Sequence, residues 1–572
     1  MKRFLPSLVL LSFLGLSVYS YADVTNNPST EESFLTTKKA AEQGYADAQV
    51  TLGIRYEEGR GVSQSNSEAF SWVKKAADQN YAIGQVILGT MYEAGKVVPQ
   101  SYSEAIQWYK KAAAEREYTD TAKANTVAAT VAYLNLGGMY YEGRGVSQSY
   151  SEAFKWYKKA AEQGNAYAQV SIGTMSAEGK GTPQSDSKAF KWYKKAANQD
   201  NPDAQHNLGS MYAEGKGTPQ SDSEAFKWYK KAANQGNTNS QYLVAYMNAE
   251  GEGTSQSDSE AFKWYKKAAD QDDAYAQVLL ANMYKEGKGT PQSDSEAFKW
   301  YKKAADQGDS DSQHNLALMY DKGDGVNQNY TEAVKWYKKA ADQGYAHSQH
   351  NLALMYDKGD GVNQNYTEAV KWYKKAADQG YARSQYNLAL LYDKGDGVDQ
   401  NYTEAVKWYK KAADQGNISA QYNLGVMYFD GLGVRQDYNK AVEWYQKAAN
   451  QGDASAQNNL GLMYRKGEGV RQNYNKAVEW YLKAVNQSNA SAQNNLAYMY
   501  NEGLGVRQDY NKAVEWHQKA ANQGDASAQF DLGVMYQYGN GVRQNNVQAK
   551  EWFGKACDNG NQKGCDNYRK LN

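Results

Sequence analysis

Tryptophan recurs through this chain at a fixed interval. Trp72 and Trp108 are 36 residues apart, and from Trp156 to Trp552 each of the remaining Trp follows the last by the same 36 residues. A constant period between about 20 and 50 residues indicates a tandem repeat, in which one supersecondary unit stacks on copies of itself. The chain is therefore predicted to be a solenoid whose core grows along one axis, without division into separate globular domains.

Each unit of 36 residues has the pattern of two helices. In the unit that starts near residue 417, small and apolar residues recur at helical spacing in each half. The first half places on one face Ala420, Leu424 and Tyr428. The second half places on one face Ala441, Trp444 and Ala448. Gly431 and Gly433 stand between them, where a turn with positive φ is expected. The fold class is therefore all-α, an αα-solenoid.

One column of the first helix holds only small residues. Its members include Gly53, Gly89, Gly137, Ala245, Ala317, Gly425 and Gly533. Small residues let two helix backbones approach closely, and we expect the Trp of the second helix to fill the space opposite. We expect the core of the repeat to include Trp72, Trp108, Trp156, Trp300, Trp444 and Trp552. Truncation of one such Trp is expected to cost about 3 to 5 kcal/mol locally.

The N-terminal segment differs in kind from the repeats. Lys2 and Arg3 precede a Leu-rich apolar run, and Ser20 to Ala22 supplies the small residues that a signal peptidase reads. We expect export with cleavage after Ala22; the alternative is a single anchoring helix. The expected organisation is a signal peptide (1–22), a linker (23–33), an N-terminal capping half-repeat (34–44), repeats 1 and 2 (45–116), an insertion (117–128), repeats 3 to 14 (129–560) and a C-terminal capping half-repeat (561–572).

The insertion is the one interruption of the period. Trp108 and Trp156 are 48 residues apart, and the twelve extra residues fall in the stretch 115–130, which lacks Gly and Pro. This composition favours a lengthened helix over a flexible loop. The segment is either a protruding binding element or a tolerated insertion, and we favour the second interpretation.

The charge balance argues against a nucleic-acid partner. Lys and Arg together number 64, as do Asp and Glu, and the chain has no basic block. After the leader no apolar run is long enough to span a bilayer, so no membrane partner is expected once the signal is removed.

The recurrent string identifies a family resemblance. The segment 456–484 reads Ala-Gln-x-x-Leu-Gly-x-x-Tyr, then Gly-x-Gly-Val, then Asn-Tyr-x-x-Ala-x-x-Trp-x-x-Lys-Ala. This string resembles the Sel-1-like repeat, a tetratricopeptide-type helical repeat, over essentially the whole mature chain. The resemblance implies a right-handed superhelix of about 14 repeats and an adaptor or recognition role without catalysis. Exported bacterial members of the family are linked to envelope assembly, signalling or host contact.

The two cysteines carry a second resemblance. Cys557 and Cys565 have the Cys-x7-Cys spacing of the Helicobacter cysteine-rich proteins within this family, which implies a disulfide between them. Some of those relatives carry a penicillin-binding or β-lactamase label, so an envelope enzyme acting on penicillin or peptidoglycan is an alternative. Its nearest nucleophile and base would be Ser185 and Lys188, but the partner motifs are missing and Ser185 is better explained as a helix cap. We expect no catalytic residue and no cofactor.

Two further patterns resemble metal sites but do not provide the ligands that one metal ion needs. His206, His314 and His350 recur at one repeat position, which would hold neighbouring imidazoles about 10 Å apart, too far for one metal. Three loops begin with Asp and end with Glu eleven residues later, as a calcium loop does: 321–332, 357–368 and 393–404. Their middle positions are Gly and Val, which supply too few oxygen ligands. No metal is expected.

An asparagine column in the first helix is the candidate binding site. Its members precede the core Leu and comprise Asn135, Asn207, Asn315, Asn351, Asn387, Asn423, Asn459 and Asn495, with Asp531 in the last repeat. Amides on a concave surface could bind the backbone of an extended peptide; the alternative is a solvated polar face. We expect an exported, periplasmic or secreted, scaffold that binds a peptide or protein. A structural spacer is a further alternative, because residues 312–344 and 348–380 are identical.

Overall fold

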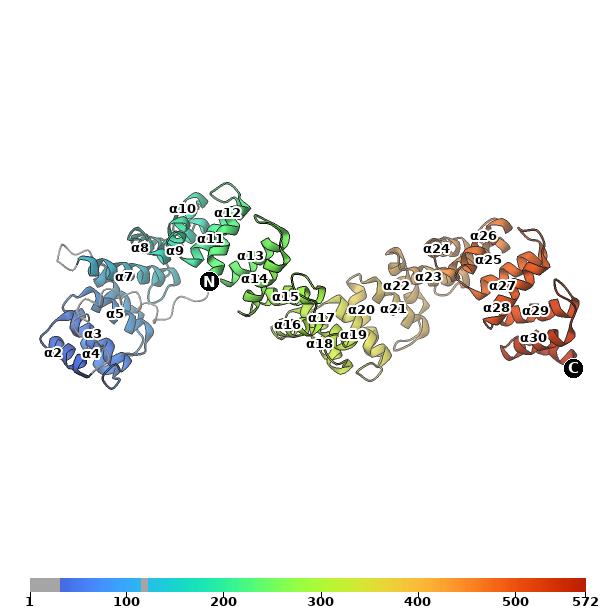
Figure 1. The fold of residues 1–572 in the computed structure, drawn as a ribbon, viewed down its shortest axis with the longest axis horizontal. Coiled ribbons are helices and arrows are strands. Elements are labelled where there is room, and N and C mark those ends of the chain that lie inside the picture. The colour runs from blue at the N-terminus through green and yellow to red at the C-terminus, as the bar shows by residue number, and fades with distance from the viewer. Residues whose placement is uncertain (1–30, 115–121, 572) are drawn as a thin grey trace. The chain divides into compact units, whose positions relative to one another are not determined.

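The computed structural model describes residues 31–114 and 122–571, and these residues form 30 helices and no strand. The chain divides into two compact units, residues 1–292 and 293–572. Figure 1 labels the helices of both units. The expected signal peptide (1–22) and most of the expected linker (23–33) lie outside the described residues. No helix within the described ranges is both long enough and apolar enough to cross a membrane.

Helices of 12 or 13 residues alternate with short loops in both units. In the first unit the helices are α2 (Glu31–Glu42), α3 (Ala46–Glu58), α4 (Asn66–Asp78), α5 (Ala82–Ala94), α6 (Tyr102–Ala113), α7 (Ala122–Glu142), α8 (Tyr150–Glu162), α9 (Ala166–Glu178), α10 (Asp186–Ala197), α11 (Pro202–Glu214), α12 (Asp222–Asn234), α13 (Thr238–Glu250), α14 (Asp258–Ala269) and α15 (Ala274–Glu286). In the second unit they are α16 (Asp294–Asp306), α17 (Ser310–Lys322), α18 (Tyr330–Asp342), α19 (Ala346–Lys358), α20 (Tyr366–Asp378), α21 (Ala382–Lys394), α22 (Tyr402–Asp414), α23 (Ile418–Asp430), α24 (Tyr438–Asn450), α25 (Ala454–Lys466), α26 (Tyr474–Val485), α27 (Ala490–Glu502), α28 (Tyr510–Asn522), α29 (Ala526–Tyr538), α30 (Asn546–Asp558) and α31 (Gln562–Lys570).

We call the first helix of each repeat helix A and the second helix B. Helix A ends on a left-handed glycine: Gly431 has φ of 77° and its backbone N–H donates to the carbonyl of Met427. Two residues later Gly433 also has positive φ, and a side chain there would overlap the backbone of Tyr402 at the start of the preceding helix B. The Gly-x-Gly turn predicted from the sequence is therefore confirmed, and its second glycine also permits close stacking of repeats.

The small-residue column faces a different aromatic residue from the one expected. A methyl group added to Gly425 would collide with the ring of Tyr445, and one added to Gly89 would collide with Tyr109. The partner is thus the residue that follows the Trp, and the expectation that Trp fills this space was wrong. Successive residues of a helix point about 100° apart, so Trp444 faces another side of helix B.

The tryptophans instead join neighbouring repeats. Trp228 packs in one cluster with Ala196 of the preceding helix B and Leu208 of its own helix A. Trp552 packs in the same way with Ala520 and Leu532. Among the Trp expected in the core, exposure is 9% or less at Trp72, Trp108, Trp300, Trp444 and Trp552, whereas Trp156 is partly buried.

A buried glutamine in helix A connects three successive helices. Gln349 Nε2 donates to the carbonyl oxygen of Ala341 at the end of the preceding helix B, 3.1 Å away. Its Oε1 accepts from Nε2 of Gln379, after its own helix B, at 2.7 Å. The same pair of bonds recurs around Gln169, Gln205, Gln241, Gln313, Gln385, Gln421 and Gln457. The carbonyls belong to buried residues, whereas the second glutamine of each pair, such as Gln379, is exposed. The glutamine column therefore satisfies carbonyl groups that stacking removes from water.

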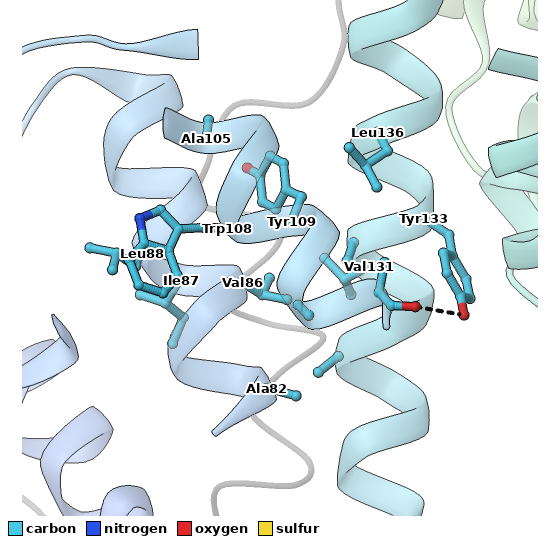
Figure 2. Close-up of a cluster of buried hydrophobic side chains, with 14 of the residues drawn as sticks. Ala82, Val86, Ile87, Leu88, Ala105, Trp108, Tyr109, Val131, Tyr133 and Leu136 are labelled. Atoms are coloured by element: carbon cyan, nitrogen blue, oxygen red, sulfur yellow. Dashed lines mark hydrogen bonds between the residues drawn. The ribbon is translucent and has the colours of Figure 1, made fainter. Parts of the chain in front are cut away.

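The repeat after the insertion replaces this glutamine with a tyrosine. Tyr133 occupies the glutamine position in α7, and its hydroxyl donates to the carbonyl oxygen of Ala113 at 3.2 Å (Figure 2). Residues 115–121 of the insertion lie outside the described residues, but from Ala122 the chain is helical and continues without a break into helix A, so that α7 has 21 residues. On the loop side, Arg144 pairs with Glu93 of the preceding repeat, 2.6 Å apart. The interface across the insertion thus keeps the carbonyl contact with a longer side chain.

The C-terminal end is closed covalently. Cys557 of α30 and Cys565 of α31 form the disulfide that the resemblance implied. The short α31 covers the last helix B, and Gly564 lies directly against Ala556. The bond therefore holds α31 against the exposed side of α30.

Candidate functional site

We call the residues that recur at the same position in nearly every repeat the frame; the buried glutamines are the frame glutamines. One set of positions on helix A is not part of this frame. It consists of the residues five before, two before, two after and five after the core Leu, which share a face because their spacing follows the helical period. In α19, whose core residue is Leu352, the stripe is His347, His350, Leu354 and Asp357. His350 is buried against its neighbours, while the other three are partly or fully exposed. We call this set of positions the helix A stripe.

The chemistry of the stripe changes along the chain while the frame stays nearly constant. At five residues after the core Leu, successive repeats carry Glu57, Glu93, Tyr141, Ala177, Ala213, Ala249, Lys285, Asp321, Asp357, Asp393, Phe429, Arg465, Asn501 and Gln537. The frame glutamine, in contrast, changes only at Tyr133. A surface whose residues vary on a constant scaffold is suited to binding different groups along one extended ligand.

Carboxylates of the stripe accept hydrogen bonds from buried tyrosines of helix B. The hydroxyl of Tyr337 donates to Asp321 at 3.3 Å, and that of Tyr409 donates to Asp393 at 3.1 Å. Tyr109 makes a shorter bond of 2.7 Å to Glu93. Burial raises the pKa of Asp321, and the hydrogen bond from the tyrosine opposes this effect. The tyrosine hydroxyls therefore reach the base of the stripe.

Imidazoles and tyrosines gather where α17, α19 and α21 begin. The exposed ring of His347 lies 6.0 Å from that of His314 and 4.9 Å from that of Tyr381, measured between centroids. His314 and His350 each bond through Nδ1 to a serine of the next repeat, Ser348 and Ser384, at 2.9 Å. Burial, with smaller effects of Arg383 and His347, lowers the pKa of His350 to about 4. Among the described residues no group of His, Cys, Asp or Glu is arranged to hold a metal ion.

Two repeats of this region have exchanged a helix cap for an aromatic residue. Tyr345 and Tyr381 occupy the N-cap positions of α19 and α21 and make no capping hydrogen bond. The equivalent Asn417 of α23 and Asp453 of α25 do cap their helices. A side-chain cap contributes about 0.5 to 2 kcal/mol, so these two tyrosines sit where a more stabilising residue is available to the fold.

The asparagine column is largely occupied by contacts between repeats. Burial raises the pKa of the Tyr337 hydroxyl, Asp321 raises it further, and a hydrogen bond with Asn351 opposes both effects. Asn387, Asn423 and Asn459 stand in the same relation to the tyrosine of the preceding repeat, and Asn135 to Tyr109. Asn495 instead donates to Oδ1 of Asn458 at 2.9 Å. Asn207, Asn315 and the other members are each partly exposed at the edge of the helix A stripe.

The remaining candidates from the sequence have structural partners. Ser185 Oγ accepts from the backbone N–H of Lys188 and caps α10, as expected. In the loop 321–332, Asp321 accepts from Tyr337, and Glu332 lies beside Lys335. The first and last carboxylates of that loop thus interact with different side chains, Tyr337 and Lys335.

A hollow of about 750 Å³ lies among the loops of the last two complete repeats. Its lining includes Tyr500, Arg507, Asp509, Tyr510 and Lys512. It is open and mixed in charge, and it is built from the same loop and helix B start that recur along the chain. The arrangement lacks the convergent nucleophile, base and oxyanion donors of a catalytic pocket.

The fold and the stripe define a protein of the tandem helical-repeat class, which presents a variable surface on a repeated frame. The family model of the Sel1 repeat matches fourteen successive segments, which cover residues 46–116 and 130–561. The chain belongs to the Sel1 repeat family. Proteins with this scaffold fold typically mediate protein–protein interaction, and typically they are not catalytic.

Solved structures give the same result. The chain is 37% identical to c5321, a protective antigen present in uropathogenic Escherichia coli strains that displays an SLR fold. That match covers 73% of this chain and 90% of the other, with a TM-score of 0.68. A Sel1 repeat protein from Oxalobacter formigenes is 34% identical over 54% of this chain and 89% of its own, with a TM-score of 0.45. No curated protein matches the sequence.

Two groups of residues that are important in the structure were not predicted from the sequence. The frame glutamines were visible as the constant Gln in the repeat string, but their two hydrogen bonds join helices that the string does not show to be adjacent. The helix A stripe was visible only in part, through the asparagines beside it. A comparison of all fourteen repeats position by position would have found its variation.

Proposed function

We propose that this protein is an exported, non-catalytic scaffold that binds a peptide or protein along the helix A stripe, on the concave face expected for the family. The observation that carries this proposal is the contrast between the constant frame and the variable stripe within one chain. Residues needed for stacking recur in every repeat, so stacking does not account for a change from carboxylate to aromatic to guanidinium at one position.

The cap exchange at Tyr345 and Tyr381 supports a binding role for the region around His347. These residues stand where Asn or Asp would add a capping bond, and they line a surface of exposed imidazole and aromatic rings. Loss of stability at a surface position is common where the residue serves binding.

Three observations support export. The leader has the order of charges, apolar residues and small residues of a signal peptide. The disulfide between Cys557 and Cys565 suits an oxidising compartment. The similar Escherichia coli chain is a protective antigen, as expected of a protein that the host immune system meets.

The test is a pull-down from bacterial envelope and host lysates with the mature chain as bait. The stripe variant carries His347→Ala and Arg383→Ala, two exposed positions. The matched control is Lys374→Ala, which removes a positive charge from the exposed side of helix B in the same repeat as His347. We expect the stripe variant to lose a partner that the wild type and the control retain. Equal capture by all three would exclude this part of the stripe.

A second bait tests the asparagine column. The variant replaces Asn315, Asn351, Asn387 and Asn423 with Ala, and the partners it retains are compared with those of the wild type. Unchanged partners would exclude peptide binding by the column and leave it a role in joining repeats. Loss of partners counts as binding only where the variant keeps the wild-type helical content and melting temperature.

The identity of residues 312–344 and 348–380 favours a structural spacer as a second candidate. A spacer needs repeat number more than individual side chains. Deleting residues 312–347 removes one repeat, and a spacer is expected to keep its one-to-one affinity for any partner while its reach changes.

A further inference from the structure

One buried tyrosine of helix B lacks the acceptor that four of its equivalents have. Tyr481 is 0% exposed, and its hydroxyl has no hydrogen-bond partner in the structure. In other repeats this hydroxyl donates to a carboxylate five residues after the core Leu: Glu93, Asp321, Asp357 or Asp393. A buried donor left unpaired lowers the stability of the folded chain, so the position needs a physical reason.

The residue that replaces the carboxylate has the opposite charge. Arg465 of α25 stands five residues after the core Leu of this repeat and lies close enough to Tyr481 to lower its pKa, although burial raises that pKa overall. The guanidinium of Arg465 packs over the ring of Tyr498 in α27, 5.0 Å from its centroid. Tyr498 is 40% exposed, so the pair lies at the surface of the stripe.

The asparagine that bonds with this tyrosine in preceding repeats also has another partner here. In preceding repeats the Asn before the next core Leu bonds with this hydroxyl, as Asn459 does with Tyr445. Here Asn495 donates to Asn458 instead. The position two after the core Leu is Leu462, where Ser210 accepts from Tyr229 in an earlier repeat. Each residue type that satisfies the hydroxyl elsewhere is therefore absent or engaged.

We propose that Arg465 and Tyr481 form a binding position for a carboxylate of an acidic peptide segment, with Tyr498 holding the guanidinium in place. The carboxylate accepts from the Tyr481 hydroxyl, as the chain's own Asp and Glu do in four other repeats, and pairs with Arg465. This assignment names the partner chemistry at one point of the helix A stripe and so rests on the function proposed above. It involves no covalent step.

The experiment measures binding of a fluorescent hexaglutamate peptide to the mature chain by fluorescence polarisation at low ionic strength, with hexaglutamine as the reference probe. We expect preference for hexaglutamate, and a Kd about tenfold higher or more in Arg465→Gln, Tyr481→Phe and Arg465→Asp. The last variant supplies the internal acceptor that the repeat lacks. Arg471→Gln, an exposed loop residue of the same repeat, makes the same charge change as Arg465→Gln and is expected to bind as the wild type.

Thermal unfolding separates this role from a structural one. Tyr481→Phe removes a hydroxyl that has no partner, so its melting temperature is expected to equal or exceed that of the wild type. Tyr409→Phe, which loses the bond to Asp393, is expected to unfold at lower temperature and to bind hexaglutamate normally.

Three results would overturn the assignment. The first is that the wild type binds hexaglutamate and hexaglutamine equally. The second is that the Arg465 and Tyr481 variants bind hexaglutamate as tightly as the wild type. The third is that inorganic phosphate displaces the probe as effectively as glutamate peptides do. Each leaves the scaffold proposal intact, because that proposal is tested separately, by the pull-downs with the stripe variant around His347 and with the asparagine variant.

Discussion

At the scale of single residues, hydrogen bonds of buried side chains contribute to the stability of this protein together with the packing of its tryptophans. Each frame glutamine is almost completely buried and satisfies one carbonyl and one amide from two different helices. Removal of such a side chain takes one of two hydrogen bonds from a buried carbonyl: the Ala341 carbonyl keeps only the bond from the backbone N–H of Gly344. The glutamine column therefore adds to the stability that the apolar core provides.

Replacing Gln349 with Met is expected to lower the local free energy of unfolding by about 0.5 to 1.5 kcal/mol, because the buried Ala341 carbonyl loses one of its two hydrogen bonds. Hydrogen exchange of the amides of α19 and α20 measures this change. Gln446→Met, which breaks only an exposed bond to Asn450, is the control. Equal protection in both variants would show that the buried pair contributes nothing.

His517 is expected to make the last repeats sensitive to acid. It replaces the tyrosine of helix B, its Nδ1 bonds to Asn494 Oδ1 at 2.7 Å, and burial lowers its pKa to about 4. His517 is protonated near pH 6.5 in the unfolded chain but only near pH 4 in the folded chain. The contribution of neutral His517 to the free energy of unfolding is therefore fully present above pH 6.5 and falls as the pH drops from 6.5 to 4. His517→Tyr, the residue of sister repeats, is expected to reduce that dependence, measured by urea unfolding at several pH values. An unchanged pH profile would contradict the assignment.

At the scale of the element, each helix pair carries its own start and stop signals. A Ser, Asn or Asp caps helix B, and a left-handed Gly ends helix A. These signals act within a few residues, which is why the turn and the Ser185 cap could be predicted from the sequence. The contact of Gly425 with Tyr445, and not with Trp444, could not be predicted. Both residues are large and aromatic, and only the packed helix pair shows which ring lies against Gly425.

Reduction of the disulfide is expected to destabilise α31 and leave the distant repeats unchanged. The bond joins Cys557 and Cys565 at a sequence separation of 8, for which about 2 to 3 kcal/mol is expected, and repeats interact only with their neighbours. Hydrogen exchange with and without a reductant, in the wild type and in a Cys557→Ala/Cys565→Ala variant, measures the effect. A loss of protection that reached α19 would contradict nearest-neighbour coupling.

At the scale of the whole molecule, the repeated frame makes the chain modular. Residues 312–344 recur unchanged as 348–380, so removing one copy leaves the same residues at each remaining interface. Stability in such an array is approximately a sum of repeat and interface terms.

Deletion of residues 312–347 is therefore expected to give a folded protein. Its helical content per residue, measured by circular dichroism, should match that of the wild type, and protection of α27 to α29 should not change. Loss of helical content beyond the deleted residues would show that the repeats depend on contacts outside their neighbours.

The period, the helix pair, the turns and the family were determined by the sequence alone, because each follows from residues close together in one repeat and is multiplied fourteen times. The tertiary structure decided which side chains of different repeats meet. Only there does Gln349 reach Ala341, Asn351 approach Tyr337, and the hydroxyl of Tyr481 stand without an acceptor beside Arg465. These contacts depend on how one repeat packs on the next. That geometry is set by the packing of whole helices, and the spacing of residues within one repeat does not predict it.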